Sequence, residues 1–132
     1  MKAETADCFA AARRQLDNAA RLLALGFPED AGRNCYLAGM NASRGLLFED
    51  AFEITRRHKT LYGALSQALH ARGIRDVALT SFLPVMASLK AIADYETGGD
   101  GITRERAAAA ITTAVAFVEA LRKIAAAPAA AS

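Results

Sequence analysis

Apolar side chains recur at spacings of three and four residues along most of the chain, the pattern of helices with one buried face. The first such segment runs from Thr5 to Leu25 and is followed by Gly26, which suits the position after a helix end. The second runs from about Pro28 to Phe52, because proline fits a first helical turn. Its apolar stripe is wide and rich in small residues, so we expect it to pack closely on several neighbours.

Three shorter segments continue the helical pattern. A polar turn at residues 55–60 precedes a third helix, which Gly73 ends. We expect the fourth helix to start near Thr80 as N-cap, since Pro84 is tolerated only in a first turn. Thr103 caps the fifth helix. Val, Ile and Thr never alternate over a strand-length run, so no sheet is expected.

The apolar stripes define the predicted core. The first two helices contribute Phe9, Ala12, Leu16, Ala19, Leu23, Cys35, Tyr36, Ala38, Met40, Ala42, Ser43, Leu46 and Leu47. The last three contribute Leu61, Leu65, Leu69, Phe82, Met86, Leu89, Ala93, Ile111, Val115, Val118, Leu121 and Ala125.

These elements predict an all-α, up-and-down bundle of four to five helices. The 132 residues suffice for one core, so residues 1–126 form a single domain and the Ala-rich residues 127–132 a disordered tail. Antiparallel neighbours would bring the turn before the third helix and the loop after the fourth helix to the same end.

Composition narrows the class of protein. Alanine makes up about a quarter of the chain and favours helix. The net charge of +2 falls short of the basic excess of a dedicated duplex-DNA binder. Cys8 and Cys35 lie far apart without metal-ligand spacing, so we expect two buried thiols, no metal site and no cofactor. Without a signal peptide or a membrane-spanning apolar run, we predict a cytoplasmic protein.

The end of the fourth helix carries the first candidate chemistry, Lys90, Asp94 and Tyr95. An acid in a last helical turn faces the negative end of the helix dipole, so helix stability does not explain Asp94. A tertiary or functional requirement is the alternative. For Tyr95, packing with a bonded hydroxyl competes with ligand contact.

The turn before the third helix is strongly basic and is expected to lie near Lys90, Arg104 and Arg106. Basic side chains beside helix N-termini favour an anion, phosphate above all. The competing interpretation is structural, because cations also stabilise a preceding helix C-terminus. The candidate anion-binding residues of this end are Arg56, Arg57, His58, Lys59, Thr60, Lys90, Asp94 and Tyr95.

A second polar pair, Asn41 and Arg44, interrupts the apolar stripe of the second helix. Solvent exposure is the simplest account of the pair. A groove or a subunit contact is the alternative, because arginine is enriched at interfaces.

Three local patterns resemble the HEPN domain (higher eukaryotes and prokaryotes nucleotide-binding), in its branch of small stand-alone prokaryotic proteins. Residues 35–47, Cys-Tyr-Leu-Ala-Gly-Met-Asn-Ala-Ser-Arg-Gly-Leu-Leu, are similar to the family's Tyr-Ala-x-x-x-x-Ala-Arg-x-Leu-Leu helix. Residues 59–65, Lys-Thr-Leu-Tyr-Gly-Ala-Leu, resemble Lys-Thr-His-x-Gly-Leu, and residues 90–95, Lys-Ala-Ile-Ala-Asp-Tyr, resemble Arg-x-x-Ala-Asp-Tyr. The order of these patterns adds to the resemblance.

The departures from the family pattern bear on catalysis. Leu61 replaces the family's histidine, and Lys90 replaces its arginine. Neither His58 nor His70 follows an arginine at the separation found in HEPN ribonucleases. The sequence therefore argues against the ribonuclease chemistry of that motif, and His58 is the only candidate catalytic residue for a divergent metal-independent endoribonuclease.

With these departures, the favoured hypothesis is a non-catalytic HEPN-type protein that binds a nucleotide, RNA or a protein partner, and the family resemblance is the basis for the rest. It also implies a homodimer and a nucleotidyltransferase partner in a toxin–antitoxin module. The divergent endoribonuclease and a purely structural, antitoxin-like interaction bundle are the alternatives.

Overall fold

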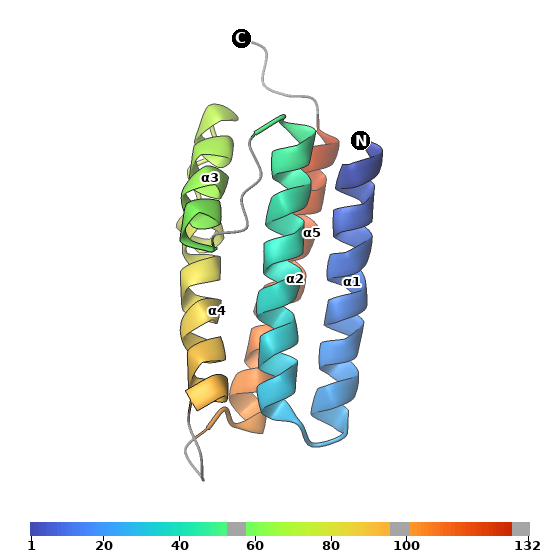
Figure 1. The fold of residues 1–132 in the computed structure, drawn as a ribbon, viewed down its shortest axis with the longest axis vertical. Helices are drawn as coiled ribbons and strands as arrows, with labels where there is room; N and C mark the ends of the chain where they lie inside the picture. Colours follow the sequence, from blue (N-terminus) through green and yellow to red (C-terminus); the bar gives the residue numbers. More distant parts are fainter. Residues whose placement is uncertain (53–57, 96–100, 128–132) are drawn as a thin grey trace.

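The computed structural model describes residues 1–52, 58–95 and 101–127, with the side chains of residues 58–59 and 92–95 excepted. Within these residues it contains five helices and no strand, which confirms the predicted all-α bundle (Figure 1). The helices are α1 (Ala3–Ala24), α2 (Pro28–Glu49), α3 (His58–Ala71), α4 (Val77–Tyr95) and α5 (Arg104–Ala126).

Four of the helices, α1, α2, α4 and α5, run alternately up and down, and α3 lies beside α2 and α4 (Figure 1). The exception to the alternation is α3, which runs parallel to α2. Tyr62 near its start bonds Tyr36 in α2, and Arg72 just after its end bonds Asp50 just after α2. The expected antiparallel step from α2 to α3 is therefore wrong, because these two tertiary contacts fix the opposite direction.

The end of α2 is set by its cap. The helix ends at Glu49, three residues before the predicted end at Phe52. Ala51 adopts a φ of 57°, and the Phe52 N–H bonds the Leu47 carbonyl at 2.9 Å. This left-handed cap satisfies carbonyls of the last turn and stops the helix.

The start of α4 also differs from the prediction. The helix begins at Val77, since the Asp76 carboxylate accepts a hydrogen bond from the Ala78 N–H at 2.9 Å and caps the first turn. Pro84 therefore lies inside the helix and not in its first turn. Both Pro84 and Thr80, whose carbonyl lacks the usual donor, are exposed, so water can replace the missing hydrogen bond.

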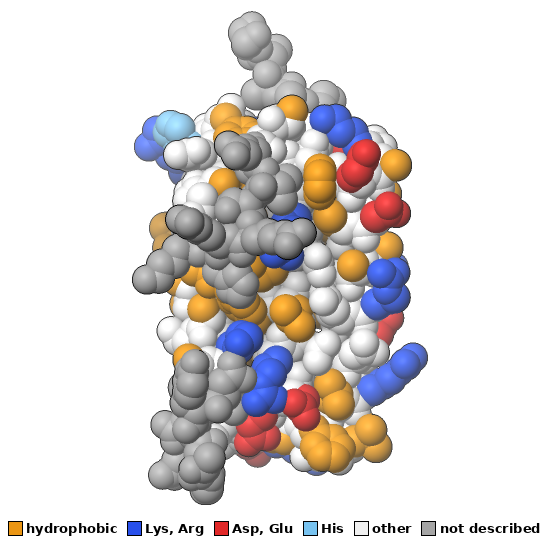
Figure 2. Space-filling view, in the orientation of Figure 1, with side chains coloured by type: hydrophobic (Ala, Val, Ile, Leu, Met, Phe, Trp, Pro, Cys, Tyr) orange, Lys and Arg blue, Asp and Glu red, His pale blue; other side chains and the backbone are white. Residues whose placement is uncertain are grey.

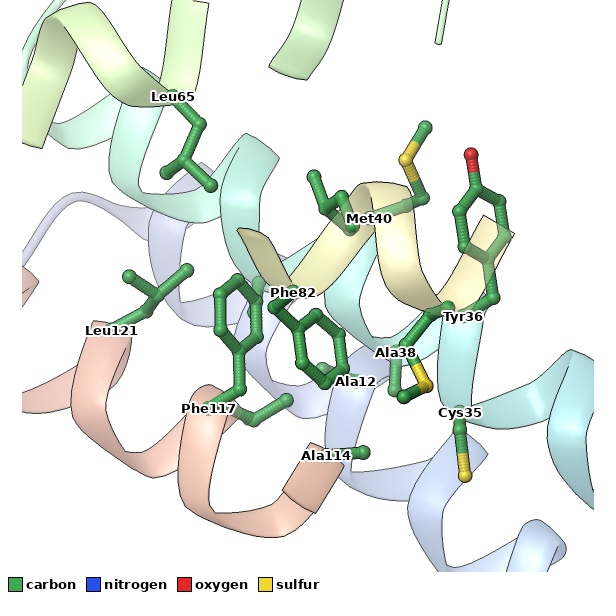
Figure 3. Packing of buried hydrophobic residues seen from close by; sticks show 14 of the residues in the cluster. Ala12, Cys35, Tyr36, Ala38, Met40, Leu65, Phe82, Ala114, Phe117 and Leu121 are labelled. Carbon is green, nitrogen blue, oxygen red and sulfur yellow. The ribbon is translucent and has the colours of Figure 1, made fainter. Parts of the chain in front are cut away.

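The core lies between α2 and its neighbours. All eight residues predicted to form the buried stripe of α2 are buried, as are Leu61, Leu65 and Leu69 of α3. Gly39 lets α4 approach closely, because a Cβ at this position would lie 2.5 Å from a ring carbon of Phe82. Phe82 in turn stacks on Phe117 of α5, with ring centroids 4.0 Å apart (Figure 3).

The register of α5 is only partly as predicted. Thr103 caps the helix, since its hydroxyl accepts a bond from the Arg106 N–H at 3.1 Å. Val118, Leu121 and Ala125 are buried as expected, but Val115 is 48% exposed. The buried face of α5 also contains four residues that the sequence analysis did not assign to the core, Ala107, Ala110, Ala114 and Phe117.

Candidate functional site

The predicted anion site falls partly outside the described residues. Arg56 and Arg57 lie outside them altogether, and His58, Lys59, Asp94 and Tyr95 lie in α3 and α4 with side chains that are likewise outside them. Thr60 is exposed in the first turn of α3, and Lys90 is half-buried in α4. The site can therefore be built from two helix segments and the described side chains around them.

Both segments adjoin the same part of α2. The hydroxyl groups of Tyr62 and Tyr36 lie 2.5 Å apart, which places the second turn of α3 beside the middle of α2. Leu89, next to Lys90, lies beside Gly32, where an added Cβ would be 3.7 Å from a Leu89 methyl group. Because Gly32 and Tyr36 are one turn apart, the start of α3 and the Lys90 turn of α4 lie on one side of α2 (Figure 1).

The connection after α2 and the connection after α4 lie at opposite ends of the bundle, and not at the same end as predicted (Figure 1). The chain leaves α2 at one end of the bundle, whereas α4 finishes at the other end (Figure 1). The two predicted segments lie on one side of α2 because α3 starts beside α2, and not because neighbouring helices alternate.

The tyrosine pair fixes α3 on α2. Tyr36 is buried, and burial above all, followed by the hydrogen bond with Tyr62, raises the pKa of its hydroxyl above the ordinary value. The positive charge of Arg44 acts in the opposite direction. Tyr36 therefore stays protonated at neutral pH and can take part in the pair as a donor or an acceptor.

Arg44 presents a positive charge on the same side of α2. It is half-buried, and in the described part of the chain its guanidinium makes no hydrogen bond or ion pair. Its charge also lowers the pKa of Cys8 of α1, where burial is the larger effect and raises it. Arg44 is thus close enough for its charge to act on both Cys8 and Tyr36.

Asn41, the second residue of the predicted groove, has a different role. Its side-chain amide donates to the Gln15 amide oxygen at 2.8 Å and so ties α2 to α1. Of the two predicted residues, Arg44 is the one without a hydrogen bond or ion pair among the described residues.

Arg33 is a basic residue of this face that the sequence analysis missed. It forms an ion pair with Asp30, whose backbone carbonyl also accepts a bond from the Asn34 amide at 2.9 Å. Lys and Arg side chains lie between the two grey areas of this face in Figure 2. The sequence could have indicated Arg33, because a residue eleven positions before Arg44 lies three helical turns away on the same face of α2.

Other kinds of site find no support among the described residues. The described residues contain no group of His, Cys, Asp or Glu suited to a metal ion. None of the helices that they form is both long and apolar enough to span a membrane. Cys8 and Cys35 are unpaired thiols, Cys35 buried and Cys8 half-buried. Burial raises the pKa of Cys35 to about 12, which suits a packing residue and not a nucleophile.

Comparison with known proteins identifies the family. The family described as HEPN domain matches residues 5–124, a span that includes parts of all five helices. A search of curated proteins found no match.

Proposed function

Because this chain belongs to the HEPN domain family, which supports a nucleotide- or RNA-related role in general, we propose that it binds a phosphate at the start of α3. The phosphate is that of a nucleotide or of RNA. In this proposal Lys59, Lys90 and the first amides of α3 hold the phosphate, and Asp94 and Tyr95 orient these groups or the base. We propose that the site also includes Thr60 and, from their places in the sequence, Arg56, Arg57 and His58.

The observation that carries the proposal is the placement of the start of α3 and the Lys90 turn on one side of α2. The amides of a first helical turn have no partner within the helix and carry partial positive charge. Arg44 supports the proposal, since a half-buried guanidinium without an ion pair among the described residues favours an anion.

The test is the double variant Lys59→Ala with Lys90→Ala. We expect its affinity for mononucleotides or single-stranded RNA to fall at least about tenfold, with unchanged helicity by circular dichroism. The matched control is Arg14→Ala with Lys123→Ala, which removes the same two charges from exposed positions on α1 and α5. Equal affinities in both double variants would rule out the proposed site.

We propose that the chain does not cleave RNA, because the arginine and histidine pattern of HEPN ribonucleases is missing from its sequence. Incubation of single-stranded RNA with purified protein and a chelator tests this point. Cleavage that disappears in the His58→Ala variant would replace the binding function with an endoribonuclease.

We also propose a homodimer and a nucleotidyltransferase partner, as the family resemblance implies. Light scattering on the purified protein tests the first proposal. Co-purification with the product of a neighbouring nucleotidyltransferase gene tests the second. A dimer that Arg44→Glu dissociates would assign Arg44 to the subunit contact instead of the phosphate face.

A further inference from the structure

A groove lies between α4 and α5, and its lining residues are different from those assigned to phosphate binding. Its volume is about 380 Å³, and the described residues that line it belong to α4 and α5. Val85, Met86 and Leu89 form the α4 wall, and Ala109 and Ala110 form the α5 wall. The lining is therefore mainly apolar.

The sizes of the facing side chains explain why the groove is open. Alanines of α5 stand opposite the larger Val85, Met86 and Leu89 of α4, so the space between the two helices is not filled. Val85 is 57% exposed as a result. An apolar molecule in the groove would remove this surface from water, which is favourable in proportion to the area covered.

The charge beside the groove is positive. Arg106 in the first turn of α5 borders it, and in the described part of the chain its guanidinium makes no hydrogen bond or ion pair. The positive end of the α5 dipole adds to this charge. The lining hydroxyls of Ser88 and Thr113 already bond carbonyls of their own helices, at 3.2 and 3.0 Å. The groove thus offers one cation and an apolar body.

We propose that this groove binds a small apolar monocarboxylate, either aromatic or acyl. The carboxylate lies on Arg106, and the hydrocarbon part lies between Val85 and Ala109. The volume falls within the range of roughly 300–1,000 Å³ that is typical of small-molecule pockets. This ligand and its site are separate from those of the proposed nucleotide function.

Titration of the isotope-labelled protein with naphthoate, followed by amide NMR, tests the proposal. We expect saturable binding at millimolar concentrations or below, with shifts centred on Ala109 and Ala110. The neutral analogue naphthylmethanol should bind about tenfold more weakly, since it lacks the charge that Arg106 recognises. Arg106→Gln should weaken naphthoate binding by a similar factor.

Two matched controls make the test specific. Arg104→Gln removes a neighbouring exposed arginine that does not line the groove, and it should leave the affinity unchanged. Ala109→Phe should block the groove, whereas Ala108→Phe adds the same ring at an exposed position outside it.

The proposal is overturned by any of three results. The first is the absence of saturable shifts, and the second is an equal effect of Arg106→Gln and Arg104→Gln. The third is unchanged binding in Ala109→Phe. Nucleotide affinity, measured on the same variants, should not change, so failure of this proposal is distinguishable from failure of the phosphate site.

Discussion

At the scale of single residues, two hydrogen bonds link buried polar side chains to other parts of this alanine-rich core. Tyr36 bonds Tyr62 across two helices, and the buried Ser43 hydroxyl donates to the Gly39 carbonyl within α2 at 2.7 Å. A buried polar group destabilises a fold unless it makes a hydrogen bond, so Tyr36 and Ser43 each need their partner for a stable core. The sequence could predict that Tyr36 is buried. It could not predict its partner, which lies 26 residues away on another helix.

The tyrosine pair can be measured with a double-mutant cycle. Tyr36→Phe and Tyr62→Phe should each lower the free energy of unfolding by about 0.5–1.5 kcal/mol, because either change removes the same hydrogen bond while it keeps the ring. The double variant should be less destabilised than the sum of the two single variants. Urea unfolding measures all four proteins. Strictly additive effects would mean that the two hydroxyls do not interact in solution.

The two thiols should differ in reactivity. Burial raises the pKa of both, to about 12 for Cys35, so at pH 8 little of either is present as the reactive thiolate. Cys8 is half-buried and Cys35 is buried, so iodoacetamide should alkylate Cys8 first. Mass spectrometry of the native protein measures the order. In urea both thiols should react at the same rate, and faster labelling of native Cys35 would contradict the packing described.

At the scale of helices, the apolar pattern predicted where helices lie and which face they bury, but not every boundary or direction. The α2 stripe was fully correct because large and small apolar residues mark it clearly. In α5 a run of alanines fits several faces, which is why Val115 was placed in the core and Phe117 was missed. The direction of α3 depends on Tyr36–Tyr62 and Asp50–Arg72, contacts that a helical period does not encode.

Close contact between α2 and α4 depends on a glycine, and a second glycine provides the control. Gly39→Ala should destabilise the protein by about 1–3 kcal/mol, since the new Cβ would lie 2.5 Å from Phe82. Gly63→Ala in α3 meets nothing within 4 Å and should stabilise it by about 0.5–1 kcal/mol. Thermal unfolding distinguishes the expected loss of stability in Gly39→Ala from the expected gain in Gly63→Ala. Stabilisation by Gly39→Ala would show that the helices can move apart freely.

At the scale of the whole molecule, one arginine joins three helix ends. The Arg72 guanidinium bonds both carboxylate oxygens of Asp50, at 2.7 and 2.6 Å. It also donates to the carbonyls of Ile124 and Ala127, at 2.6 and 3.3 Å. The ends of α2, α3 and α5 thus meet at a nearly buried ion pair, with 8% and 12% of the Arg72 and Asp50 side chains exposed. This cluster holds the end of α3 and the tyrosine pair holds the region near its start, and the proposed phosphate site requires α3 in this position.

Removing one partner of a buried ion pair leaves the other charge without compensation, so Arg72→Met should destabilise the protein by about 3 kcal/mol. Asp50→Asn should also destabilise it, and the double variant should lose less than the sum of both changes. Arg75→Met is the control, since Arg75 is exposed and should change stability by no more than about 0.5 kcal/mol. Amide exchange in Arg72→Met should accelerate first in α3, because only apolar packing and the Tyr36–Tyr62 bond near its start then hold that helix along α2. If α3 stays protected and Arg72→Met unfolds no earlier than Arg75→Met, the position of α3 does not depend on this cluster.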